Sequence, residues 1–213
     1  MMCPNTIVMT HGPGVVLMPW ADNENVTAIL AAHYPDEESG NSIVDVLWGV
    51  QEPSGRLPYT IPRTASDYGL PIVEHVDAKG DPNAWQADFT ESQLIDYRHF
   101  DASAIDPIYR FGFGLSYTTF EMDDVLNVEI TGGSLTAYAN ESMGFAPGGL
   151  HDLAGFAVPQ LYVSLPQDTT PSGTPMKVLR GFKKVRLDAS ETKQVEFELT
   201  RRDISYWNVE ETA

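Results

Sequence analysis

Two adjacent glutamates are the first residues that could do chemistry. Glu37 and Glu38 stand directly before a Ser-Gly turn, and two carboxyl groups can share the roles of general acid and general base. Such a pair must converge on one point in space, which neighbours in sequence seldom do. Acids just ahead of a helix are also favoured by the positive end of its dipole. We therefore interpret both as helix N-terminal acids and keep the acid/base pair as the weaker alternative.

His11 is the second candidate, because it follows the apolar stretch Thr6–Thr10 directly. In α/β proteins, ligands bind at the carboxyl ends of strands. His11 is therefore a candidate for lining a ligand cleft, with a hydrogen-bonded structural histidine as the alternative. The glycines that follow do not form a phosphate loop, since the lysine and the glycine spacing of that motif are missing.

A dense polar cluster comprises Asp96, Tyr97, Arg98, His99 and Asp101. A metal site is conceivable here. We expect a strand over 94–97, however, and successive residues of a strand point to opposite faces. The better interpretation is a strand end held by salt bridges.

Ser116 is not a catalytic serine of the nucleophile-elbow type, because Tyr117 follows it where that motif needs x-Gly.

Composition narrows the function further. The 213 residues carry 13 basic and 30 acidic side chains, a formal charge of −17. This charge argues against nucleic acid and against an anionic membrane surface as partners. Cys3 is the single cysteine, which excludes an internal disulfide and a cysteine-based zinc site. We find no apolar run long enough for a membrane span and no signal peptide, while Asn25 and Asn140 begin sequons compatible with glycosylation.

The elements that position these residues begin as alternating strands and helices. We expect strands at 6–10 and 26–30, and a helix over 41–48 that Ser39 or Asn41 caps and Gly49 ends. Ile43, Val44, Leu47 and Trp48 should form its apolar face. This alternation predicts part of an α/β sandwich with a parallel-type sheet.

The pattern changes to all-β at about Asp123. Residues 62–108 form an irregular excursion, and we expect strands at 125–130, 157–165, 178–187 and 193–199. The predicted boundary divides the chain into an α/β domain with its linker, residues 1–122, and a β domain, residues 123–213.

A series of motifs carries a family resemblance. Tyr109–Phe120 reads YRFGFGLSYTTF; upstream are Glu37–Gly49 and Pro53–Pro62, and downstream are Val158–Val163, Val178–Val185 and Leu199–Trp207. In this order and spacing they resemble the C-terminal part of glycoside hydrolase family 3, fungal secreted β-glucosidase type. The second domain is similar to an incomplete form of a fibronectin type III-like β-sandwich.

The resemblance implies hydrolysis of terminal β-D-glucosyl residues by the intact enzyme, in the breakdown of cellulose and oligosaccharides. Both family carboxylates, a nucleophile on an N-terminal barrel and an acid/base, would fall before residue 1. No residue here inherits a catalytic role, and no metal or cofactor is implied. His11 would then line the cleft that faces the barrel, and among the tryptophans only Trp85 is a candidate for stacking on sugar, because Trp48 and Trp207 fit core positions.

The sequence also departs from the family pattern. The strand with an Asn-Thr-Gly turn that should precede Val158 is missing, and relatives continue past the Ser-Tyr-Trp motif where this chain stops at Ala213. We expect a compromised second domain with exposed strand edges, and self-association of the isolated chain. The expected location, by resemblance, is extracellular.

Two other functions remain open. The chain could be a non-catalytic module that binds carbohydrate or protein, or, with less support, an autonomous hydrolase that uses its own acids.

Overall fold

The computed structural model describes residues 3–69, 89–122, 126–129 and 153–206. The chain folds into two compact units, each assembled from separate stretches of sequence. The first unit contains Met1–Pro35, Leu57–Phe111 and Pro171–Met176, and the second contains Asp36–Arg56, Gly112–Thr170 and Lys177–Ala213.

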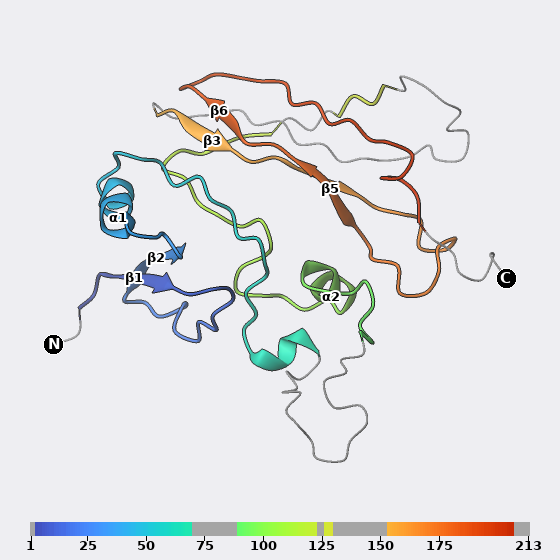
Figure 1. Cartoon of the computed structure of the whole chain (residues 1–213), viewed down its shortest axis with the longest axis horizontal. Coiled ribbons are helices and arrows are strands. Elements are labelled where there is room, and N and C mark those ends of the chain that lie inside the picture. Colours follow the sequence, from blue (N-terminus) through green and yellow to red (C-terminus); the bar gives the residue numbers. More distant parts are fainter. Residues whose placement is uncertain (1–2, 70–88, 123–125, 130–152, 207–213) are drawn as a thin grey trace, which may run out of the picture. The chain divides into compact units, whose positions relative to one another are not determined.

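A parallel pair of strands forms the sheet of the first unit. β1 (Thr6–His11) runs beside β2 (Val26–His33), from Thr6 opposite Val26 to His11 opposite His33 (Figure 1). Along β1, half-buried and exposed residues alternate, which leaves Ile7 and Met9 on the outer face. Both predicted strands and the predicted parallel pairing are confirmed.

Two short helices complete the first unit. They are the 3-10 helix η1 (Ala65–Tyr68) and α2 (Tyr97–Ala102). Ile61 bridges to Tyr109, and the apolar side chains of Met18, Ile61 and Phe100 are only 1–3% exposed. This small core fixes the segments that follow the sheet.

The predicted strand over 94–97 is wrong. Asp96 takes a left-handed backbone angle, φ 51°, and its carboxylate accepts a hydrogen bond from the Tyr97 N–H. This side chain caps the first turn of α2, so the polar cluster starts a helix and does not end a strand.

The predicted helix near residue 41 is α1 (Ser39–Leu47), in the second unit. Its N-cap is Glu38, without a side-chain capping bond, so the expected cap at Ser39 or Asn41 is wrong. Gly49 follows with φ 76° and donates to the Val46 carbonyl, which confirms the predicted glycine at the helix end.

The expected core position of Trp48 is also wrong. Its side chain is 74% exposed, and α1 contains no buried residue. Val44 at 50% and Leu47 at 38% share this exposure, so the apolar face predicted for the helix lies open in this chain.

The described strands of the second unit form two antiparallel pairs. β3 (Gly155–Ala157) pairs with β6 (Val185–Leu187), and β4 (Gln160–Val163) pairs with β5 (Val178–Phe182). Two expected long strands are thus each divided in two. The first breaks at Val158-Pro159, because proline has no N–H to donate to a ladder, and the second breaks at Lys183-Lys184.

The strand predicted at 193–199 does not form, although half-buried and exposed side chains still alternate along part of the segment. Val195 and Phe197 are half-buried, while Glu196 and Glu198 are exposed. Residues 126–129 are likewise irregular; the rest of that predicted strand and most of the segment before Val158 lie outside the described residues.

Among the described residues, no helix is both long enough and apolar enough to cross a bilayer.

Candidate functional site

Two histidines stand at the carboxyl end of the parallel pair. His11 ends β1, His33 ends β2, and the two residues lie opposite each other across the ladder. The His33 carbonyl accepts a hydrogen bond from the Gly12 N–H at 3.3 Å, which holds the two strand ends together. His33 takes φ 53°, so the chain turns sharply where the strand ends. Strand ends of this kind are where α/β sheets present ligand-binding groups.

Tyr59 joins this edge from a later segment. Its ring lies edge-on to His33 with centroids 5.6 Å apart, and its hydroxyl is 3.4 Å from both imidazole nitrogens. Burial raises the pKa of Tyr59, so the phenol remains a neutral donor through the physiological range.

The neighbour of Tyr59 is tightly fixed. Thr60 is 1% exposed, and its N–H and hydroxyl donate to the Asp96 carboxylate at 2.8 and 2.9 Å. The Thr60 carbonyl accepts from the Tyr68 hydroxyl at 3.0 Å. Every hydrogen-bonding group of this threonine that the fold buries is therefore paired, which holds Tyr59 in place.

This edge can bind a polar ligand. Imidazoles and a phenol can donate to and accept from hydroxyl groups. In the part of the chain that the structure describes, neither imidazole is hydrogen-bonded to a carboxylate, and no group of three or more metal-ligating side chains could hold a metal ion. The edge supports binding and positioning.

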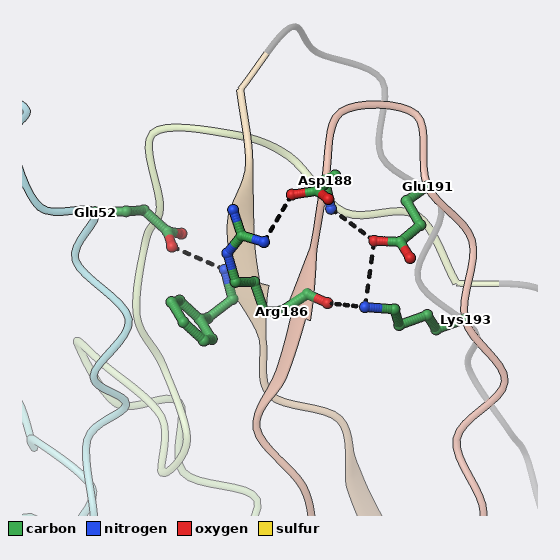
Figure 2. Close-up of polar contacts among 6 residues, drawn as sticks. Glu52, Arg186, Asp188, Glu191 and Lys193 are labelled. Atoms are coloured by element: carbon green, nitrogen blue, oxygen red, sulfur yellow. Dashed lines mark hydrogen bonds and ion pairs between the residues drawn. The ribbon is translucent and has the colours of Figure 1, made fainter.

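Glu52 organises the second unit. One carboxylate oxygen accepts from the Ser116 hydroxyl, and the other accepts from the Phe156 N–H at 2.8 Å. The carboxylate thus links the segment after α1, the aromatic and glycine-rich motif, and the start of the β domain. Figure 2 shows Glu52 reaching across to the strand that carries this N–H.

The glycines of the motif explain its composition. A Cβ on Gly114 would overlap the Gly55 carbonyl oxygen. Gly112 has φ 80°, and a Cβ there would lie 2.5 Å from the Gln160 side chain. The Tyr117 hydroxyl donates to the Val46 carbonyl at the end of α1. The motif is therefore a packed connector between α1 and the β strands.

A chain of polar contacts follows on β6 and the turn after it. Arg186 pairs with Asp188 at 2.8 Å, and the Glu191 carboxylate accepts from the Asp188 N–H, also at 2.8 Å. Lys193 donates to the Arg186 carbonyl at 2.6 Å and pairs with Glu191 (Figure 2). The hydrogen bond from the Asp188 N–H is the largest effect on the pKa of Glu191 and lowers it, and Lys193 lowers that pKa further. These contacts lie at an exposed turn and shape it without forming a site.

The remaining candidates separate plainly. Glu37 and Glu38 are exposed at the start of α1, as interpreted from the sequence, and Glu38 accepts from the Asn41 amide at 2.6 Å. Asn25 is half-buried and directly precedes β2. Trp85, Asn140 and Trp207 lie outside the described residues.

Sequence reasoning missed His33, Tyr59 and Glu52. His33 had a usable signal, because extending the second strand by one residue beyond Ala32 places a histidine at its end. Glu52 had none, since its partners are 64 and 104 positions away.

Comparison with known proteins assigns the chain. Residues 1–117 match the model for the glycosyl hydrolase family 3 C-terminal domain, and residues 157–213 match the fibronectin type III-like domain. The chain belongs to glycoside hydrolase family 3. The α/β and β-sandwich parts expected from the family 3 resemblance are thereby confirmed.

Curated relatives in this family are longer than the chain. A protein of Neosartorya fischeri named "Probable beta-glucosidase G" is 51% identical over 224 residues, covering 97% of this chain and 27% of the relative. An Aspergillus niger protein named "Probable beta-glucosidase M" is 43% identical, covering 98% of this chain and 28% of its own length. The chain therefore spans just over a quarter of these family 3 proteins.

Solved structures of the family agree. The β-D-glucoside glucohydrolase of Trichoderma reesei superposes with a TM-score of 0.80 at 36% identity, covering 98% of this chain and 30% of its own. The β-glucosidase D2-BGL of Chaetomella raphigera gives 0.81 at 34% identity, with 99% and 30% covered.

Proposed function

We propose that this chain is the non-catalytic scaffold of a family 3 β-glucosidase, and that both catalytic carboxylates, a nucleophile on a barrel domain and a separate acid/base, lie outside residues 1–213. The observation that carries the proposal is that the chain matches 27% of the length of relatives named as probable β-glucosidases. The intact enzyme would hydrolyse terminal β-D-glucosyl residues of oligosaccharides and cellulose fragments. Export would place it outside the cell.

In this proposal, the carboxyl edge of β1 and β2 faces the barrel. His11 is exposed at that edge, where it can reach a ligand, and His33, in contact with Tyr59, lies opposite it at the end of β2. These groups would contact substrate or the barrel surface, not the bond that breaks.

We also propose a domain boundary at residues 122 and 123 and a shortened second domain. The alignment with the Neosartorya relative runs over 224 residues, which is longer than the chain itself, so that relative carries residues with no counterpart here. A strand missing from the β domain would account for residues of this kind.

The proposal is tested by complementation. The part of the Neosartorya relative that this chain does not match is expressed separately, and its aryl β-glucoside turnover is measured with and without this chain. We expect turnover to rise when the chain is added, and to rise less with the His11→Ala variant. A chain with Glu37→Gln and Glu38→Gln serves as the control and should complement fully. Equal barrel activity with and without the chain would contradict a scaffold role.

A further inference from the structure

A hollow opens at the amino end of the parallel pair, opposite the histidine edge. Its volume is about 370 Å³, and its lining includes Trp20, Asn23, Asn25 and Val26. Ligand pockets have volumes of about 300–1,000 Å³, so this hollow has the size for one small unit and not for a chain of sugars.

The lining joins an aromatic ring to amides. Trp20 is half-buried, and Val8 and Val26 add apolar surface from the two strands. Thr6, Asn23 and Asn25 supply donors and acceptors around them. A pyranose ring needs this combination, because its C–H face is apolar and its rim carries hydroxyl groups.

The amide of Asn25 is held at the rim. Its backbone carbonyl accepts from the Thr6 N–H at 2.8 Å, which ties it into the sheet. Its N–H and its side-chain amide both donate to the Asn23 Oδ1, at 2.9 and 3.2 Å. Asn25 also begins the sequon Asn25-Val26-Thr27, so a modified amide would belong to the hollow that Trp20 also lines.

We propose that Asn25 carries an N-linked glycan and that its first N-acetylglucosamine sits in this hollow against Trp20. The oligosaccharide comes from a lipid-pyrophosphate donor: the bond from C1 to the phosphate oxygen breaks, and C1 bonds to Asn25 Nδ2. The oxygen keeps the electron pair, and Nδ2 loses one proton. One Nδ2–H remains after this step and can donate to Asn23 Oδ1.

The proposal rests on the export proposed above, but its test is independent of glucosidase activity. The full chain is secreted from a eukaryotic host with Asn140→Gln, which leaves Asn25 as the single sequon. Intact mass should show a glycan, and Thr27→Val should remove it. Thr27 is exposed, and valine suits a strand, so this variant preserves the fold.

The position of the N-acetylglucosamine against Trp20 is tested by thermal unfolding. The glycosylated chain, trimmed enzymatically to one N-acetylglucosamine, should melt about 2–4 °C above the Thr27→Val chain. The same two sequences made in bacteria, without glycan, should melt together. With Trp20→Ala, occupancy should persist while the difference between glycoforms disappears, and Trp20→Phe should retain part of it.

Release of the glycan by an amidase gives a second measurement that does not depend on the melting of variants. It should be slower from the native Trp20 chain than from the native Trp20→Phe chain, and equal for both after denaturation. The proposal would be overturned if Asn25 is unmodified. It would also be overturned if substitution of Trp20 changes neither the glycan's effect on the melting temperature nor its rate of release. Failure of barrel complementation would leave this result intact, so the two proposals fail separately.

Discussion

Single residues in the connector decide how closely its backbones approach. Gly114 has an ordinary backbone angle, so its requirement is steric: the Gly55 carbonyl oxygen occupies the place of a Cβ. Gly155 is similar, since Thr118, Glu52 and Phe120 surround its Cβ position. The glycines can be read from the sequence, but the backbone that comes so close is 59 positions away and invisible to local patterns.

Gly114→Ala should therefore destabilise the chain by about 1–3 kcal/mol, because overpacking forces backbone shifts. The control is Gly40→Ala on α1, where nothing lies within 4 Å of the added Cβ. That change should be neutral or stabilising by up to about 1 kcal/mol, since alanine favours helix. Urea unfolding of both variants measures the difference, and equal midpoints would contradict the close approach.

Glu52→Ala should cost about 1–3 kcal/mol, because it leaves the half-buried Phe156 N–H without its acceptor. Glu198→Ala in the same unit, at an exposed position, should change stability by less than about 0.5 kcal/mol. Thermal unfolding checks the pair. If the two variants melt alike, Glu52 is not the link between the motif and β3.

Elements were predictable where the signal was local. The strands at 6–10 and 26–30 and the helix ended by Gly49 follow from runs of apolar residues and a glycine stop, and all three form. The strand at 94–97 failed because Asp96 bonds Thr60, a long-range contact that outweighs strand propensity. The edge formed by His11, His33 and Tyr59 could be predicted only in part. His11 follows an apolar run that the sequence shows, whereas Tyr59 is brought there by tertiary folding.

Tyr68, whose hydroxyl donates to the Thr60 carbonyl, should make the free energy of unfolding fall at alkaline pH. Burial, followed by the charge of Asp96 and by Tyr59, raises the pKa of Tyr68 to about 12. An unfolded tyrosine ionises near pH 10, so between about pH 10 and 12 the unfolded chain loses a proton that the folded chain retains. The contribution is complete below pH 10 and is lost as pH rises through this window.

Tyr68→Phe should flatten that fall, although Tyr59 and Tyr109, whose pKa values burial also raises, should leave part of it. At neutral pH the variant should lose about 1 kcal/mol with the hydrogen bond to Thr60. Urea unfolding across pH 8–11.5 measures the slope. An unchanged slope would show that Tyr68 does not titrate with unfolding.

At the scale of the whole molecule, apolar surface is uncovered in both units. Ile7 is 54% and Met9 41% exposed on β1, and Trp48 and Val50 are 74% and 67% exposed beside α1. Phe113 and Tyr117 of the connector, at 40% and 47%, add to this. Surfaces of this kind mark places where protein packs against protein. These exposed apolar surfaces fit a chain that spans 27% of the length of its Neosartorya relative.

The isolated chain should therefore self-associate despite its charge of −17. We expect concentration-dependent sedimentation that Ile7→Lys with Met9→Lys reduces. Glu198→Lys changes charge at a position outside these surfaces and should leave association unchanged. A monodisperse wild-type monomer across micromolar concentrations would be inconsistent with open apolar faces.

The most direct test of the central claim is turnover by the purified chain alone. With cellobiose or an aryl β-glucoside as substrate, we expect no release of glucose above the buffer control, because the proposed scaffold role places the carboxylates that cleave the bond outside residues 1–213. Sustained release by the chain alone, lost in the variant carrying Glu37→Gln and Glu38→Gln, would contradict it.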